Sequence, residues 1–121
     1  MQYRLKVEIE YMIALGNEKS IKDLPPFSKN DQTRLRTIYR NFNKACAEKV
    51  KEIEATTNHD VKAIEYYIQG KTKKALHPWV HFALTSEDVN NLSYSLMWQD
   101  GLNQIYLPTL QSVHKELKKL A

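Results

Sequence analysis

The chain has 121 residues, of which 42% are apolar and 26% charged, and it contains three glycines and four prolines. This length and composition suit one ordered domain or part of one, and they exclude collagen-like, low-complexity and disordered classes. The formal net charge of +4 suits a nucleic acid, an anionic metabolite or plain solubility equally well, so charge selects no function.

Cysteine content and hydropathy indicate the compartment. The single cysteine, Cys46, excludes an internal disulfide framework and a cysteine-rich zinc site, which favours a reducing environment. The sequence has no run of roughly 18 apolar residues, and its start lacks the pattern of a secretory signal. We therefore expect a soluble cytoplasmic protein that does not associate with a membrane.

The first predicted element, Tyr3 to Leu15, fits two patterns. Its apolar residues alternate with polar ones as in a half-buried strand, yet Leu5, Ile9 and Met12 also form a helical stripe. We predict a helix because good helix formers dominate the segment and no partner strand follows.

A second helix is predicted to start among the capping residues Ser28 to Asp31. Its apolar stripe runs from Leu35 to Ile53 and predicts one uninterrupted helix. The cap-forming and turn-forming residues Thr56 to Asp60 then end it, and a third, shorter helix is expected from there to Gly70.

The C-terminal third predicts one long element. After a helical turn at Pro78, Thr85 or Ser86 should cap a helix that runs to about Leu120, roughly 50 Å long, with a kink near Pro108. The predicted fold class is all-α.

Several kinds of site are poorly supported. His77 and His81 have the spacing of zinc ligands on one helix face, but no third ligand lies nearby, so packing is the better interpretation. The sequence has neither a nucleophile elbow nor a glycine-rich phosphate loop. Two lysine clusters, at residues 71–74 and 115–119, are better explained as solvated surface than as a nucleic-acid interface.

Two polar clusters stand at predicted helix starts, Thr57 to Asp60 and Thr85 to Asp88. Helix capping alone would explain both. Alternatively, the unpaired N–H groups at such starts bind carboxylate or phosphate, with His59 as a further donor.

Two segments resemble the adenylosuccinate lyase family of the fumarase and aspartase superfamily, in particular its bacterial branch: residues 55–67, ATTNHDVKAIEYY, and residues 80–93, VHFALTSEDVNNLS. The resemblance implies that residues 1–76 belong to an N-terminal helical domain and that residues 77–121 begin a central bundle of long helices. It also implies homotetramers and a cytoplasmic location, with no cofactor, metal or nucleic-acid partner.

The implied activity is a lyase reaction of purine biosynthesis. Fumarate is eliminated from adenylosuccinate, giving AMP, and from the succinylated aminoimidazole carboxamide ribotide. The family's serine base and histidine acid belong to motifs outside this chain, so the resemblance predicts a fragment that is inactive alone. The alternative is a free-standing helical interaction module without catalysis.

Residue roles follow from the two matched segments. Asn58, His59 and Asp60 match the first substrate-binding motif, and the resemblance implies that His59 holds the nucleotide end of the substrate. Thr85 and Ser86 match the second motif and would hold the succinyl portion. The neighbours expected to support these contacts are Lys62, Glu87, Asp88 and Asn90, whereas His81 and Trp79 are expected to pack.

Overall fold

The computed structural model describes residues 1–120, and every regular element within them is helical. The elements are α1 (Gln2–Leu15), α2 (Lys29–Arg40), α3 (Lys44–Thr57), α4 (Asp60–Gln69), the 3-10 helix η1 (Lys74–Trp79), α5 (Ser86–Gly101), the π-helical η2 (Leu102–Tyr106) and α6 (Leu107–Leu120). The predicted all-α class is confirmed. None of the described helices is long and apolar enough to cross a membrane.

Helix α1 lies at the centre of the helical body and packs against α2, α4 and α5. Leu5 and Ile9 belong to the main apolar cluster, whereas Val7 joins a second one with Val61 of α4 and Val89 of α5. A helix with partners on several sides buries more than one face. This explains why its sequence resembles the alternation of a strand, and the helix predicted here is confirmed.

The single helix predicted through Leu35 to Ile53 is wrong, because the chain breaks between Arg40 and Lys44. Asn43 caps α3 by accepting a hydrogen bond from the Cys46 N–H at 3.1 Å. Both helices direct apolar side chains into the same core, so the stripe continues across the break. Hydrophobic periodicity does not register such a break, whereas the capping asparagine does.

The third predicted helix is confirmed as α4, which packs against α3. Asn58 joins the two helices in the left-handed conformation, with a φ of 50°. Asparagine tolerates this conformation better than most residues, so the turn needs no glycine.

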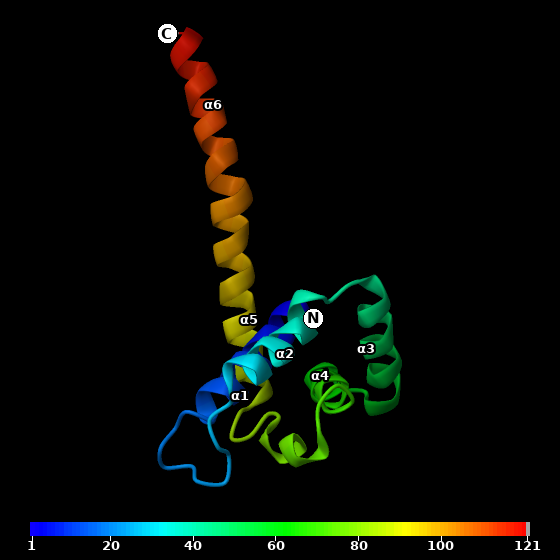
Figure 1. Ribbon diagram of the computed structural model, residues 1–121. Helices are drawn as coiled ribbons and strands as arrows, with labels where there is room; N and C mark the ends of the chain where they lie inside the picture. The colour runs from blue at the N-terminus through cyan, green and yellow to red at the C-terminus, as the bar shows by residue number, and fades with distance from the viewer. Residues whose placement is uncertain (121) are drawn as a thin grey trace.

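Helices α5, η2 and α6 continue into one another as a single rod, the long helix that the sequence predicts. Figure 1 shows it projecting from the body, with only its α5 end beside the other helices. The π-helical turn η2 ends just before Pro108, at the point where the proline ring removes a backbone donor. Beyond it, apolar side chains such as Leu110, Val113 and Leu117 remain at least half exposed.

Candidate functional site

The first motif occupies the junction between α3 and α4. His59 caps α4, because its Nδ1 accepts a hydrogen bond from the Lys62 N–H at 3.1 Å. This bond requires an unprotonated Nδ1, so the proton of the neutral ring resides on Nε2. Asn58 and His59 are both exposed, and Nε2 remains available as a donor.

Asp60 is the most strongly held residue of this motif. Its Oδ1 accepts the Val61 N–H at 2.8 Å, and its Oδ2 lies 2.7 Å from Nη2 of Arg4. The carboxylate is thus shared between the first turn of α4 and an arginine from α1. It serves as a structural link between the two helices, and its side chain is still 45% exposed.

The second motif begins α5. Thr85 and Asp88 form a reciprocal capping box, in which the Thr85 hydroxyl accepts the Asp88 N–H at 3.3 Å and Asp88 Oδ2 accepts the Thr85 N–H at 2.7 Å. The bond from the Thr85 backbone N–H holds the pKa of Asp88 below its usual value. Thr85 is exposed, and Ser86 is the half-buried first residue of the helix. The cap predicted here is confirmed.

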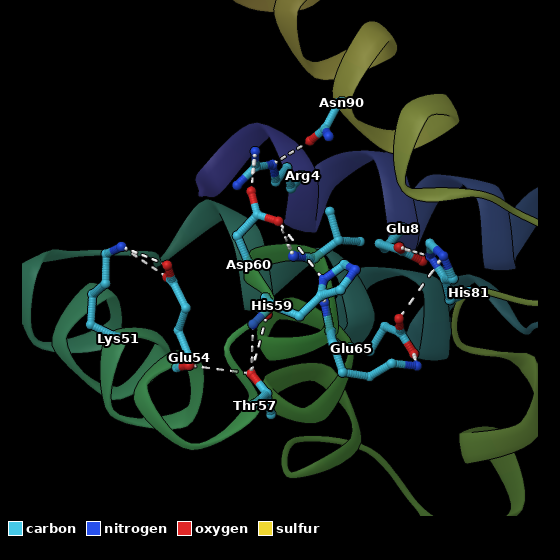
Figure 2. A network of polar contacts seen from close by, with 12 residues as sticks. Arg4, Glu8, Lys51, Glu54, Thr57, His59, Asp60, Glu65, His81 and Asn90 are labelled. Atoms are coloured by element: carbon cyan, nitrogen blue, oxygen red, sulfur yellow. Dashed lines mark hydrogen bonds and ion pairs between the residues drawn. The ribbon is translucent and has the colours of Figure 1, made fainter.

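Arg4 connects the two motifs, as Figure 2 shows. While one guanidinium nitrogen pairs with Asp60, its Nε donates to Oδ1 of Asn90 on α5 at 2.8 Å. The sequence around Arg4 does not distinguish it as a site residue, because its partners Asp60 and Asn90 lie far along the chain. The two sequence segments therefore share one charged side chain from α1.

A buried charged group lies beside this bridge (Figure 2). Nδ1 of His81 is 2.6 Å from Oε1 of Glu8, and its Nε2 is 3.9 Å from Oε1 of Glu65. Lys62 in turn donates to Oε2 of Glu65 at 2.7 Å. His81 has a left-handed backbone with a φ of 62°. The expectation that His81 merely packs is wrong, since its ring joins two acidic side chains from different helices.

Both carboxylates of this group are buried. Glu8 and Glu65 are 2% and 5% exposed, and burial raises the pKa of Glu8 even though the bond to His81 opposes this effect. The His81 ring and the Lys62 ammonium supply hydrogen bonds that offset part of the cost of burying the two carboxylates. The sequence indicated His81 and Lys62 of this group but neither Glu8 nor Glu65.

The remaining candidates do not gather into a site. His77 Nε2 lies 3.4 Å from the Thr72 carbonyl, and Trp79 packs on the Phe82 ring with centroids 5.1 Å apart. Among residues 1–120, no group of three or more His, Cys, Asp or Glu side chains is arranged to hold a metal ion.

The chain is thus an all-α protein in which both polar motifs cap helices that a single arginine connects. A sequence model described as "Lyase" matches residues 1–121, the whole chain. The chain therefore belongs to this lyase family.

Curated relatives make the similarity more specific. The chain is 40% identical over 126 residues to the adenylosuccinate lyase of Haemophilus influenzae and 40% identical to that of Vibrio cholerae; each alignment covers 100% of this chain and 28% of the relative. The adenylosuccinate lyase of Dictyostelium discoideum is 39% identical over 129 residues, again with 28% of its length covered. The chain thus spans little more than a quarter of the length of these relatives.

Proposed function

We propose that this chain supplies substrate-binding elements of an adenylosuccinate lyase, an enzyme of purine nucleotide biosynthesis in the cytoplasm. The assembled enzyme would eliminate fumarate from adenylosuccinate, giving AMP, and from the succinylated aminoimidazole carboxamide ribotide. The observation that carries the proposal is the Arg4 bridge, because it joins the two family-like motifs at 2.7 and 2.8 Å.

In this proposal the exposed polar groups contact the substrate. His59 offers Nε2–H to the nucleotide end, and Asn58 stands beside it at the start of α4. Ser86 offers its hydroxyl and the first turn of α5 its remaining backbone N–H groups, which suit a succinyl carboxylate. The Thr85 hydroxyl, which donates to Asp88 at 2.8 Å, would exchange that bond for one to the substrate. Asp60 belongs to the site as the partner that orients Arg4.

The domain division follows the same proposal. Residues 1–76 form part of an N-terminal helical domain, and residues 77–121 start the central helical bundle. The exposed apolar side chains along α5 and α6 support association of copies, as in a homotetramer. The general acid and base are expected from segments that this chain does not contain, so the chain alone should be inactive.

The free-standing interaction module is the less favoured alternative. The relatives that match over the whole chain are named adenylosuccinate lyases, and both polar motifs are present at helix starts.

The test is reconstitution. The chain is mixed with the portion of the Haemophilus influenzae relative that it does not match, and fumarate release from adenylosuccinate is followed spectrophotometrically. We expect no turnover from either part alone and turnover from the mixture. His59→Ala should abolish the restored activity, whereas the matched surface variant Thr109→Ala should retain it.

Two results would contradict the proposal: turnover by the lone chain contradicts the predicted incompleteness, and full activity with His59→Ala contradicts the role of the first motif. If the parts fail to associate, calorimetric titration of the chain with AMP gives a second readout. Binding by the parent chain that His59→Ala weakens supports the proposal, and no binding by the parent chain counts against it.

A further inference from the structure

A cavity of about 530 Å³ opens between α2, the first turn of α3, the end of α4 and the segment that leads into η1. Its volume falls within the range of small-molecule sites. Of the two family-like segments only Tyr67, the last residue of the first one, lines it, and none of Asn58, His59, Asp60, Thr85 and Ser86 does. The cavity is therefore a separate feature from the proposed substrate site.

The inner wall of the cavity is apolar. Leu35, Ile38 and Leu76 contribute aliphatic side chains, and Phe27 and Tyr67 contribute aromatic rings. Leu35 and Tyr67 are buried residues of the main core, so this wall is fixed by packing and does not depend on surface side chains. Such a wall suits the apolar body of a ligand.

The rim of the cavity carries mainly positive charge. Arg34, Lys71 and Lys73 line it, against one carboxylate, that of Asp31. Within the described part of the chain, none of these three cations forms an ion pair with a carboxylate. Asp31 is itself engaged as an acceptor from the Ser28 hydroxyl at 2.6 Å. An anionic group at this rim would meet uncompensated positive charge.

A polar pair lies in the same wall. Cys46, the only cysteine of the chain, lies in this wall with Tyr67, and the Tyr67 hydroxyl lowers the pKa of the thiol. Burial raises the pKa of Tyr67 to about 12, so its hydroxyl stays protonated. Nζ of Lys71 lies 5.8 Å from the centre of the Tyr67 ring. One thiol thus reports directly on whether the cavity is occupied.

We propose that this cavity is a binding site for a small amphipathic anion, in which an apolar body rests on Leu35, Ile38 and Leu76 while a carboxylate pairs with Arg34 and Lys71. The occupant is a free small molecule with one acidic group. A dicarboxylate or a nucleotide would place further charge against the apolar wall. The site is independent of the proposed lyase function, since it uses none of the same side chains.

Alkylation of Cys46 by iodoacetamide, at fixed pH, measures the occupancy. Octanoate is the anionic probe, and octanamide is its neutral counterpart with the same apolar body. We expect octanoate to slow alkylation in a saturable way and to bind about two- to fivefold more tightly than octanamide, the difference expected for exposed ion pairs. Because Cys46 is the only thiol, binding of the probes to the exposed apolar residues of α6 does not enter the readout.

Matched variants separate the charge from the fold. Arg34→Gln and Lys71→Gln together should remove the preference for octanoate over octanamide, whereas Lys115→Gln on α6 should preserve it. Circular dichroism verifies that each variant is folded. An alkylation rate that octanoate leaves unchanged, or equal protection by both probes in the parent chain, would overturn the proposal.

Discussion

The buried Glu8–His81 pair predicts an asymmetry between its two single variants. Glu8→Gln keeps the size of the side chain and one hydrogen bond to the ring, and it places the amide NH2 where Oε2 has no hydrogen-bond partner among the described residues. The loss is confined to the charge assistance of the 2.6 Å bond, about 1–2 kcal/mol of unfolding free energy.

His81→Asn is expected to cost more. Asparagine tolerates the left-handed backbone at this position, so the change tests the ring and not the turn. Its shorter side chain leaves the carboxylate of Glu8, which is 2% exposed, without the hydrogen-bond partner that His81 provides. Removal of one member of a buried pair costs about 3 kcal/mol or more at neutral pH.

The sign of the pH dependence follows from the raised pKa of Glu8. Without the His81 hydrogen bond, which lowers this pKa, the folded-state value lies further above the usual 4.5. A carboxyl with a raised folded pKa destabilises the fold above that pKa, and the cost disappears as pH falls toward the unfolded value. The penalty of His81→Asn should therefore be largest near neutrality and shrink toward pH 4.5.

Urea unfolding followed by circular dichroism measures both variants and the double variant. The double variant has a neutral amide in place of the Glu8 carboxylate and so buries no charge there, which should recover about 1–2 kcal/mol relative to the sum of the two single changes. Additive single effects, or a His81→Asn penalty that does not change with pH, would refute the coupling between Glu8 and His81.

Three further outcomes are expected. Thr85→Ala removes the capping box and should lower the unfolding free energy by about 1 kcal/mol in the same assay, whereas Ser95→Ala on the exposed face of α5 should have a much smaller effect. Because the pKa of Asp88 is held low, its stabilising contribution is present above the usual 3.8 and is lost as pH falls through the lower folded value. Asp88→Asn should therefore weaken the fall of the unfolding free energy at acidic pH. An unchanged fall at acidic pH would contradict this role. Leu117→Lys should reduce the sedimentation coefficient of a self-associating chain, while Gln111→Lys on the same helix should not, and equal effects would exclude an apolar interface.

Local features of the site could be predicted from the sequence, whereas contacts between distant segments could not. Thr85 and His59 are caps, and a cap is decided by residues three positions apart, so the pattern is visible in a short stretch. Arg4 and Glu8 act on partners more than fifty residues away. Nothing in their own neighbourhood distinguishes them from ordinary charged positions on an amphipathic helix.

Glu8 shows most clearly why sequence reasoning has this limit. A glutamate between Val7 and Ile9 fits a strand or a helix that turns its polar residues to solvent, and its expected place is the surface. Because α1 packs on several sides, the position is buried, and the ring of His81 provides the partner that makes burial tolerable. The packing of α1 on several sides also explains why apolar and polar residues alternate in its sequence in a way that fits both a strand and a helix.

Helix α6 presents the opposite case, with apolar residues that the described chain leaves in solvent. Leu110, Val113 and Leu117 recur at spacings of three and four, and each is at least half exposed. Helix α6 has 14 residues, and a helix of this length is marginal in water without packing. Its stability must then come from continuity with α5 and from burial against another surface, at about 25 cal/mol per Å² of apolar area covered. This requirement ties the folding of the rod to association, so α6 should gain protection from hydrogen exchange under the conditions that make the chain self-associate.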